Sequence, residues 1–124
     1  MRLLFLASIL LSQIFFTSDA SAQMQPYEDV DLELVLLADA TGSIDDEEIA
    51  FQRSGYAEAI VDPRVLAAIE TGAYQRIAVT YIEWADEWSQ DVVADWTIID
   101  GVASAAAFAE RLTTAPRRAY GRNA

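Results

Sequence analysis

The 124-residue chain contains no cysteine, no histidine and no lysine. Without cysteine there can be no disulfide and no thiolate metal site. Without histidine the chain lacks the commonest general base and the commonest transition-metal ligand, so any metal must be held by oxygen atoms. The chain contains eight arginines and twenty acidic residues, which gives a net charge of −12, and its sequence has no basic patch. These charges argue against nucleic-acid binding.

The amino end carries the pattern of a secretory signal peptide. Arg2 precedes an apolar run at residues 3–16, and the small residues Ala20, Ser21 and Ala22 follow it. A run of about 14 residues is short for a membrane-spanning helix. We therefore expect cleavage after Ala22, export to the periplasm or the outside of the cell, and no membrane span in the mature protein.

The remaining sequence predicts one small domain. Residues 23–29 contain Pro26 and polar side chains, and we expect a short tether there. Residues 30–124 are enough for a single domain only. Because the chain has no cysteine, side-chain packing alone must stabilise this domain.

A buried strand and the residues after it are the most informative part of the chain. Residues 32–38 are apolar apart from Glu33 and do not alternate, which predicts a central strand covered on both faces of a parallel sheet. Asp39, Thr41 and Ser43 follow at every second position. Open α/β sheets bind their ligands at the carboxyl ends of the strands. These three side chains are therefore candidate ligand-binding residues.

The rest of the chain predicts an α/β fold in the order β-α-α-β-β-α. The polar connection 86–91 is too short for a parallel crossover, so we expect its flanking strands to form a hairpin. The buried stripe of the second helix is expected at Val65, Leu66 and Ile69. The expected elements are a helix from the acidic cluster 45–48 to Asp62, a helix from Pro63 to near Gly72, strands at 76–84 and 92–99, and a helix capped by Ser104 and ended by Pro116.

The residues after the first strand also carry a family resemblance. Asp39, Thr41 and Ser43 resemble the Asp-x-Ser-x-Ser element of von Willebrand factor A (VWA) domains, with Thr41 in place of the first serine. The chain as a whole resembles a bacterial exported family of unknown function, DUF1194, that is built on such a domain. The resemblance implies a partial VWA, Rossmann-like open sheet. The stretches that carry it are 30–43, 52–56, 62–63, 76–84, 96–100 and 115–118.

The resemblance implies binding and not catalysis. VWA domains form a metal-ion-dependent adhesion site that usually holds Mg²⁺, and an acidic group of a protein partner completes the coordination of this ion. Asp39, Thr41 and Ser43 would be metal ligands here. Their carboxylate and hydroxyl oxygens suit a hard cation, and alternate side chains of an extended loop project the same way.

The end of the chain departs from the family pattern. Where the resemblance leads us to expect Gly-Thr-Ser, with a further ligand, the sequence reads Gly121-Arg122-Asn123-Ala124. We therefore expect residues 30–124 to correspond to the first half of the domain. In the family's sheet the first strand lies in the middle, so its free edge would be open. An apolar edge at residues 32–37 predicts poor solubility or self-association.

Three alternatives remain open at this point. Asp39 and Thr41 also resemble the loop of haloacid-dehalogenase-like hydrolases and P-type ATPases, where Asp39 would be a phosphoryl-accepting nucleophile, although such sites normally use a lysine. The chain could also be an inactive, truncated gene product. Finally, residues 39–45 could be a simple polar turn in which Ser43 or Asp45 caps the following helix.

Overall fold

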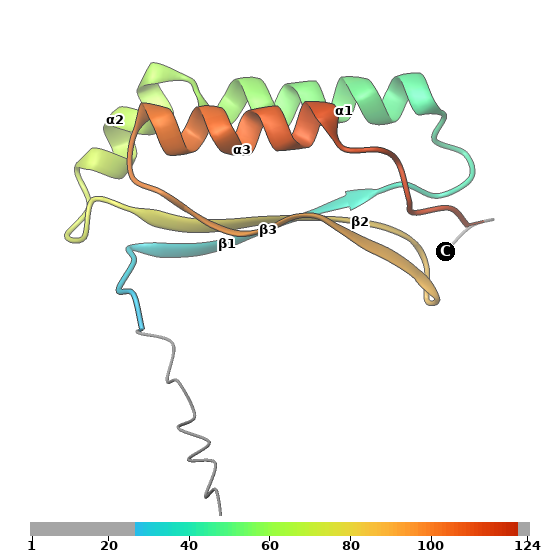
Figure 1. The fold of residues 1–124 in the computed structure, drawn as a ribbon, viewed down its shortest axis with the longest axis horizontal. Helices are drawn as coiled ribbons and strands as arrows, with labels where there is room; N and C mark the ends of the chain where they lie inside the picture. The colour runs from blue at the N-terminus through green and yellow to red at the C-terminus, as the bar shows by residue number, and fades with distance from the viewer. Residues whose placement is uncertain (1–26, 122–124) are drawn as a thin grey trace, which may run out of the picture.

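The computed structural model describes residues 27–121, so the predicted signal peptide and most of the tether lie outside the described residues. The predicted order β-α-α-β-β-α is confirmed (Figure 1). No helix within residues 27–121 is long and apolar enough to cross a membrane. The elements are β1 (Leu32–Asp39), α1 (Asp46–Ile60), α2 (Pro63–Glu70), β2 (Ile77–Asp86), β3 (Ser89–Ile99) and α3 (Val102–Thr114).

The three strands form one mixed sheet in the order β1-β2-β3. Strand β1 runs parallel to β2, with Leu32 opposite Ile77 and Asp39 opposite Trp84. Strand β3 runs antiparallel to β2, and only residues 87–88 connect them, so the predicted hairpin is confirmed. The parallel pairing requires a crossover, which α1 and α2 provide. The carboxyl ends of β1 and β2 consequently lie side by side.

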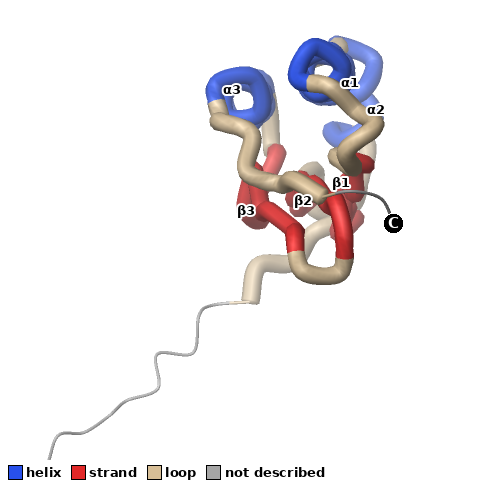
Figure 2. Tube along the Cα trace, turned by 90° about the vertical axis from the view of Figure 1, so that its right-hand side faces the viewer, coloured by secondary structure: helices blue, strands red, loops and turns tan. Residues whose placement is uncertain are grey.

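All three helices cover the same face of the sheet, as the two views at right angles show (Figures 1 and 2). The core lies between the two layers and contains Val79 and Tyr81 of β2 with Phe108 and Leu112 of α3, all at most 1% exposed. The ring of Tyr56 in α1 meets that of Tyr81 edge to face, with centroids 5.3 Å apart. The core thus holds α1 and α3 against β2.

The prediction for β1 is right about its edge and wrong about its cover. Within residues 27–121 only β2 pairs with it, so its other edge is open as expected, but the strand is covered on one face and not on both. Val35 and Leu37 point to the uncovered face and are 50% and 60% exposed. An apolar run without alternation indicates that both faces of a strand can be buried, but it does not identify which part of the protein packs against the second face.

The starts of the helices follow the sequence signals in two cases of three. Asp45 caps α1, and Glu48 completes a capping box with it. Asp62 caps α2, with Pro63 at the first helical position. The prediction for Ser104 is wrong, because α3 begins earlier, after Gly101. The Ser104 hydroxyl instead bonds Asp100, whose backbone N–H donates to it across 3.0 Å.

One further prediction fails in α2. Val65 was expected in the buried stripe, but it is 37% exposed, whereas Leu66 and Ile69 are buried at 8% each. Helix α2 lies near the edge of the sheet, over the first strand (Figure 2). Only a narrow stripe of α2 therefore reaches the core.

Candidate functional site

The candidate site is the loop of residues 39–45, called the site loop below, which joins β1 to α1. At its start, the backbone N–H of Ala40 donates to the carbonyl of Trp84 across 2.8 Å, so the loop leaves the sheet beside β2. Ala40 is fully buried, as is Ala85 in β2. The loop therefore begins from a fixed position at the carboxyl end of the sheet.

The structure brings the hydroxyls of Thr41 and Ser43 together and ties Asp39 to the same turn. The two hydroxyl oxygens lie 3.3 Å apart. One carboxylate oxygen of Asp39, Oδ1, accepts a hydrogen bond from the backbone N–H of Thr41 across 2.8 Å. Thr41 is buried at 5% exposure, Asp39 is half-buried and Ser43 is exposed. The three predicted residues thus form one local cluster that opens to solvent on the side of Ser43.

The cluster fits part of the coordination shell of a hard cation. In an octahedral shell with bonds of 2.0–2.1 Å, neighbouring oxygens are about 2.9 Å apart, close to the spacing of the two hydroxyls. Asp39 Oδ2 has no hydrogen-bond partner among residues 27–121 and can serve as a third ligand. No group of three or more acidic side chains that could hold a metal occurs in this part of the chain. Three of six positions would therefore be left to water or to a partner.

Helix capping does not account for Ser43. Asp45 caps α1, because its Oδ1 accepts from the backbone N–H groups of Glu47 and Glu48, each across 2.9 Å. Glu48 in turn accepts from the backbone N–H of Asp45. The capping alternative thus applies to Asp45, and the hydroxyl of Ser43 contacts only Thr41 among the described residues.

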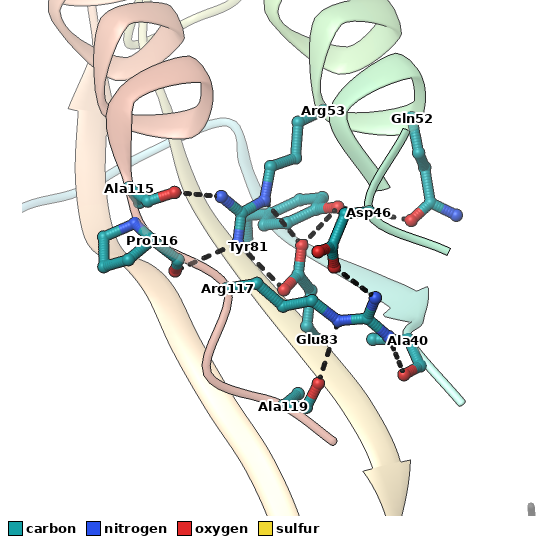
Figure 3. A network of polar contacts seen from close by, with 10 residues as sticks. All are labelled: Ala40, Asp46, Gln52, Arg53, Tyr81, Glu83, Ala115, Pro116, Arg117 and Ala119. Carbon is teal, nitrogen blue, oxygen red and sulfur yellow. Dashed lines mark hydrogen bonds and ion pairs between the residues drawn. The ribbon is translucent and has the colours of Figure 1, made fainter. Parts of the chain in front are cut away.

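Beside the site loop lies a buried ion pair that the sequence reasoning missed. Arg53 of α1 and Glu83 of β2 form a two-pronged contact: Nε to Oε1 at 2.7 Å and Nη2 to Oε2 at 2.9 Å (Figure 3). Their side chains are 6% and 0% exposed. The hydrogen bonds with Glu83 raise the pKa of Arg53 above its ordinary value, and burial raises the pKa of neighbouring Tyr81.

The same arginine anchors the chain after α3. Residues 115–121, called the C-terminal segment below, pass under the end of α3 toward the site loop (Figure 3). Arg53 Nη1 donates to the carbonyl of Ala115, and Nη2 lies 3.4 Å from the carbonyl of Pro116. Arg53 therefore joins α1, β2 and this segment at one point.

A second arginine connects the C-terminal segment to the site loop directly. Arg117 Nη2 donates to the carbonyl of Ala40 across 2.9 Å, and Nη1 contacts the carboxylate of Asp46 at 2.8 Å (Figure 3). Its Nε donates to the carbonyl of Ala119. Ala119 is fully buried and packs in a small cluster with Ala40. The site is thus built from three segments: the site loop, the end of β2 and the C-terminal segment.

Two sequence signals could have located this network. Arg53 stands four residues after Ile49 and four before Ala57, so it lies on the buried face of α1. Glu83 continues the alternation of Val79 and Tyr81 toward the core. In addition, the network draws on four of the stretches that carry the family resemblance, namely 30–43, 52–56, 76–84 and 115–118.

The comparisons with known proteins give a family and one distant structural likeness. A family model described as "Protein of unknown function (DUF1194)" matches residues 29–124. No curated protein is significantly similar to the chain. The vWF domain of the type V pili tip protein Mfa5 from Porphyromonas gingivalis is similar at 11% sequence identity with a TM-score of 0.41. That match covers 77% of this chain and 29% of the other, so the chain spans less than a third of that structure.

Proposed function

Because this chain belongs to the DUF1194 family, whose model spans residues 29–124, we propose that it is an exported, VWA-like binding module and not an enzyme. It works in the periplasm or outside the cell. Its site binds Mg²⁺ through Asp39, Thr41 and Ser43, and an acidic group of a protein partner completes the coordination. The observation that carries the proposal is the 3.3 Å spacing of the Thr41 and Ser43 hydroxyls beside Asp39, at the carboxyl end of β1.

The charge of the chain supports a cation-mediated contact. A protein of net charge −12 repels an acidic partner, and the long-range part of this repulsion is screened only in part by salt. The site contributes one carboxylate, Asp39, and two neutral hydroxyls. A divalent cation held there supplies a local positive charge of about one unit after neutralisation by Asp39. That charge attracts a single carboxylate.

The amino end of α1 does not supply this attraction by itself. Two N–H groups of its first turn, those of Glu47 and Glu48, already donate to Asp45. Three acidic residues occupy the first turn, and they further oppose an incoming anion. Recognition of an acidic group in the site loop therefore depends on the cation.

Binding of Mn²⁺, a spectroscopic substitute for Mg²⁺, tests the metal site. We expect the full chain to bind one Mn²⁺, measured by electron paramagnetic resonance of the free ion, and Asp39→Asn to weaken this binding at least tenfold. Glu58→Gln is the matched control, because it removes one negative charge from an exposed position of α1. Equal Mn²⁺ affinity of Asp39→Asn and Glu58→Gln would refute the assignment of the site.

The partner's acidic group is tested with acetate as the probe. Open coordination positions hold water, whose exchange on bound Mn²⁺ is measured by water-proton relaxation. Acetate should lower this relaxation by displacing water in the wild type. If the relaxation of bound Mn²⁺ does not respond to acetate, the site binds a cation but not a carboxylate, and the partner proposal is wrong.

No observation in the described residues favours the phosphoryl-transfer alternative. The chain has no lysine, and the guanidinium of Arg117, which contacts the site loop, is engaged by Ala40, Asp46 and Ala119. Incubation with acetyl phosphate is a direct check. Mass spectrometry should find Asp39 unmodified, and a phosphorylated Asp39 would replace the binding proposal by a hydrolase.

A further inference from the structure

The side chain of Arg117 connects both ends of the site loop. Its Nη2 donates to the carbonyl of Ala40, the second residue of the loop, across 2.9 Å. Its Nη1 contacts the carboxylate of Asp46, the first residue of α1, at 2.8 Å (Figure 3). One guanidinium group therefore spans the loop that carries the three candidate metal ligands.

The guanidinium of Arg117 is itself held in place. The side chain is only 11% exposed, and its Nε donates to the carbonyl of Ala119 across 3.2 Å. The ring of Tyr120 lies against the guanidinium, with 4.9 Å between Cζ and the ring centroid. A planar group that is bonded at all three nitrogens has little freedom to turn. Arg117 thus presents a fixed pair of donors to the site loop.

A single peptide group carries the contact from Arg117 to Asp39. The carbonyl of Ala40 and the backbone N–H of Thr41 belong to the same planar, trans peptide. The carbonyl accepts from Arg117, and the N–H donates to Asp39 Oδ1 across 2.8 Å. A charged donor at the carbonyl polarises the peptide and strengthens the hydrogen bond that its N–H makes. Arg117 therefore acts on the carboxylate of Asp39 through this peptide.

We propose that Arg117 is a positioning residue of the cation site. By holding the peptide between Ala40 and Thr41, it keeps Asp39 Oδ1 on the backbone N–H and leaves Oδ2 for the ion. The inference rests on the proposed function, because it requires that the site loop binds Mg²⁺. Groups that orient a metal-binding side chain typically contribute about 10–100-fold to the affinity for the metal.

The charge of Arg117 acts in the opposite direction from its position. A guanidinium beside the site repels a cation, and the contact with Asp46 offsets this repulsion only in part. If charge alone mattered, removing Arg117 would tighten cation binding. If Arg117 positions Asp39, removing it weakens cation binding. The sign of the change in affinity therefore separates the two effects.

Binding of Mn²⁺ to the full chain, measured by electron paramagnetic resonance of the free ion, gives this sign. Arg117→Met should raise the dissociation constant about tenfold or more. Arg118→Met is the matched control, because it removes the same charge from the next residue, which is exposed, and it should leave Mn²⁺ binding unchanged or slightly tighter. Arg117→Met that binds Mn²⁺ as tightly as Arg118→Met, or more tightly, would overturn the inference.

Hydrogen exchange at the backbone N–H of Thr41 tests the route through the peptide, without any metal. In Arg117→Met this N–H should exchange about tenfold faster than in the wild type, beyond any change at the amides of β2, which report opening of the core. In Arg118→Met it should exchange as in the wild type. If Arg117→Met leaves the exchange of Thr41 unchanged, Arg117 does not hold this peptide and the inference is wrong.

A conservative variant is used if circular dichroism shows that Arg117→Met does not fold. Arg117→Lys keeps the charge, but one ammonium group cannot span Ala40 and Asp46 as the planar guanidinium does. It should bind Mn²⁺ about threefold more weakly than the wild type, or weaker still, because the peptide is held less firmly. Wild-type affinity of Arg117→Lys would contradict the positioning role.

Failure of the proposed function is recognised separately. A wild type that binds no Mn²⁺, or Asp39→Asn that binds it as the wild type does, refutes the metal site itself. When the wild type binds Mn²⁺ and Asp39→Asn weakens the binding, the metal site stands. The arginine variants then decide the role of Arg117 alone.

Discussion

Replacing Glu83 by glutamine removes the charge that compensates Arg53 while leaving the shape of the side chain almost unchanged. Both side chains are nearly inaccessible to solvent, at 0% and 6% exposure. Arg53 then keeps its contacts with the carbonyls of Ala115 and Pro116 but no longer has an anionic partner. In addition, the amide nitrogen of glutamine turns one acceptor into a donor that faces an arginine N–H.

The expected cost is large for a domain of this size. Removing one partner of a buried ion pair costs about 3–5 kcal/mol. At about 0.05–0.15 kcal/mol per residue, the 95 described residues carry a total stability of roughly 5–14 kcal/mol. Glu83→Gln should therefore remove between a fifth and all of the stability, and lower the melting temperature by about 12 °C or more.

Urea unfolding followed by circular dichroism measures this cost. Glu58→Gln, the same chemical change at an exposed position of α1, should alter the free energy of unfolding by less than about 0.5 kcal/mol. The double variant Arg53→Met/Glu83→Leu removes both charges and should regain part of the loss, but not all of it, because two backbone carbonyls lose their donor. A Glu83→Gln protein as stable as Glu58→Gln would refute the reasoning.

Two further predictions concern the contacts around the sheet. Arg117→Ala should cost about 1–3 kcal/mol, because the carbonyl of Ala40 loses its donor, and should speed hydrogen exchange in the C-terminal segment; unchanged exchange there would contradict this role. The carboxylate of Asp31 accepts from the backbone N–H of Tyr74, which lowers its pKa. The contribution of the Asp31 carboxylate to the free energy of unfolding is therefore fully present above about pH 3.8, and it is lost as the pH falls through the lowered pKa of the folded protein. In Asp31→Asn, urea unfolding at several pH values should show a weaker loss of stability in acid, and an unchanged profile would exclude Asp31 as a cause.

Much of the fold could be predicted from local sequence signals. The apolar alternation at 76–84 and the short connection before 92–99 correctly predict the hairpin of β2 and β3. Asp45 and Asp62 act at the helix starts where acidic caps are favoured. That β1 is covered on one face only could not be predicted in this way, because hydrophobicity indicates that a strand can be buried but not which part of the protein buries it. The family resemblance is confirmed by the match over residues 29–124.

The candidate site was predictable in part. Asp39, Thr41 and Ser43 stand at every second position, and the structure places them in one cluster, because such spacing acts over a short stretch of chain. That they bind a metal ion stays a prediction. The contact between Arg53 and Glu83 joins positions thirty residues apart in different elements. Such a pairing depends on how α1 is rotated against the sheet, which local propensity does not specify.

Hydrogen bonds attach the site loop to the rest of the domain, and they couple ligand binding at this loop to folding of the domain. Ala40 is bonded on one side to the backbone of Trp84 and on the other to Arg117, so the loop cannot rearrange without disturbing both β2 and the C-terminal segment. A ligand that requires this loop geometry binds the native state and not the unfolded chain. By thermodynamic linkage, any ion or molecule held there at a hundred times its dissociation constant adds about 2.7 kcal/mol to the unfolding free energy. The melting temperature of this protein, measured at a series of ligand concentrations, therefore reports how tightly the ligand binds.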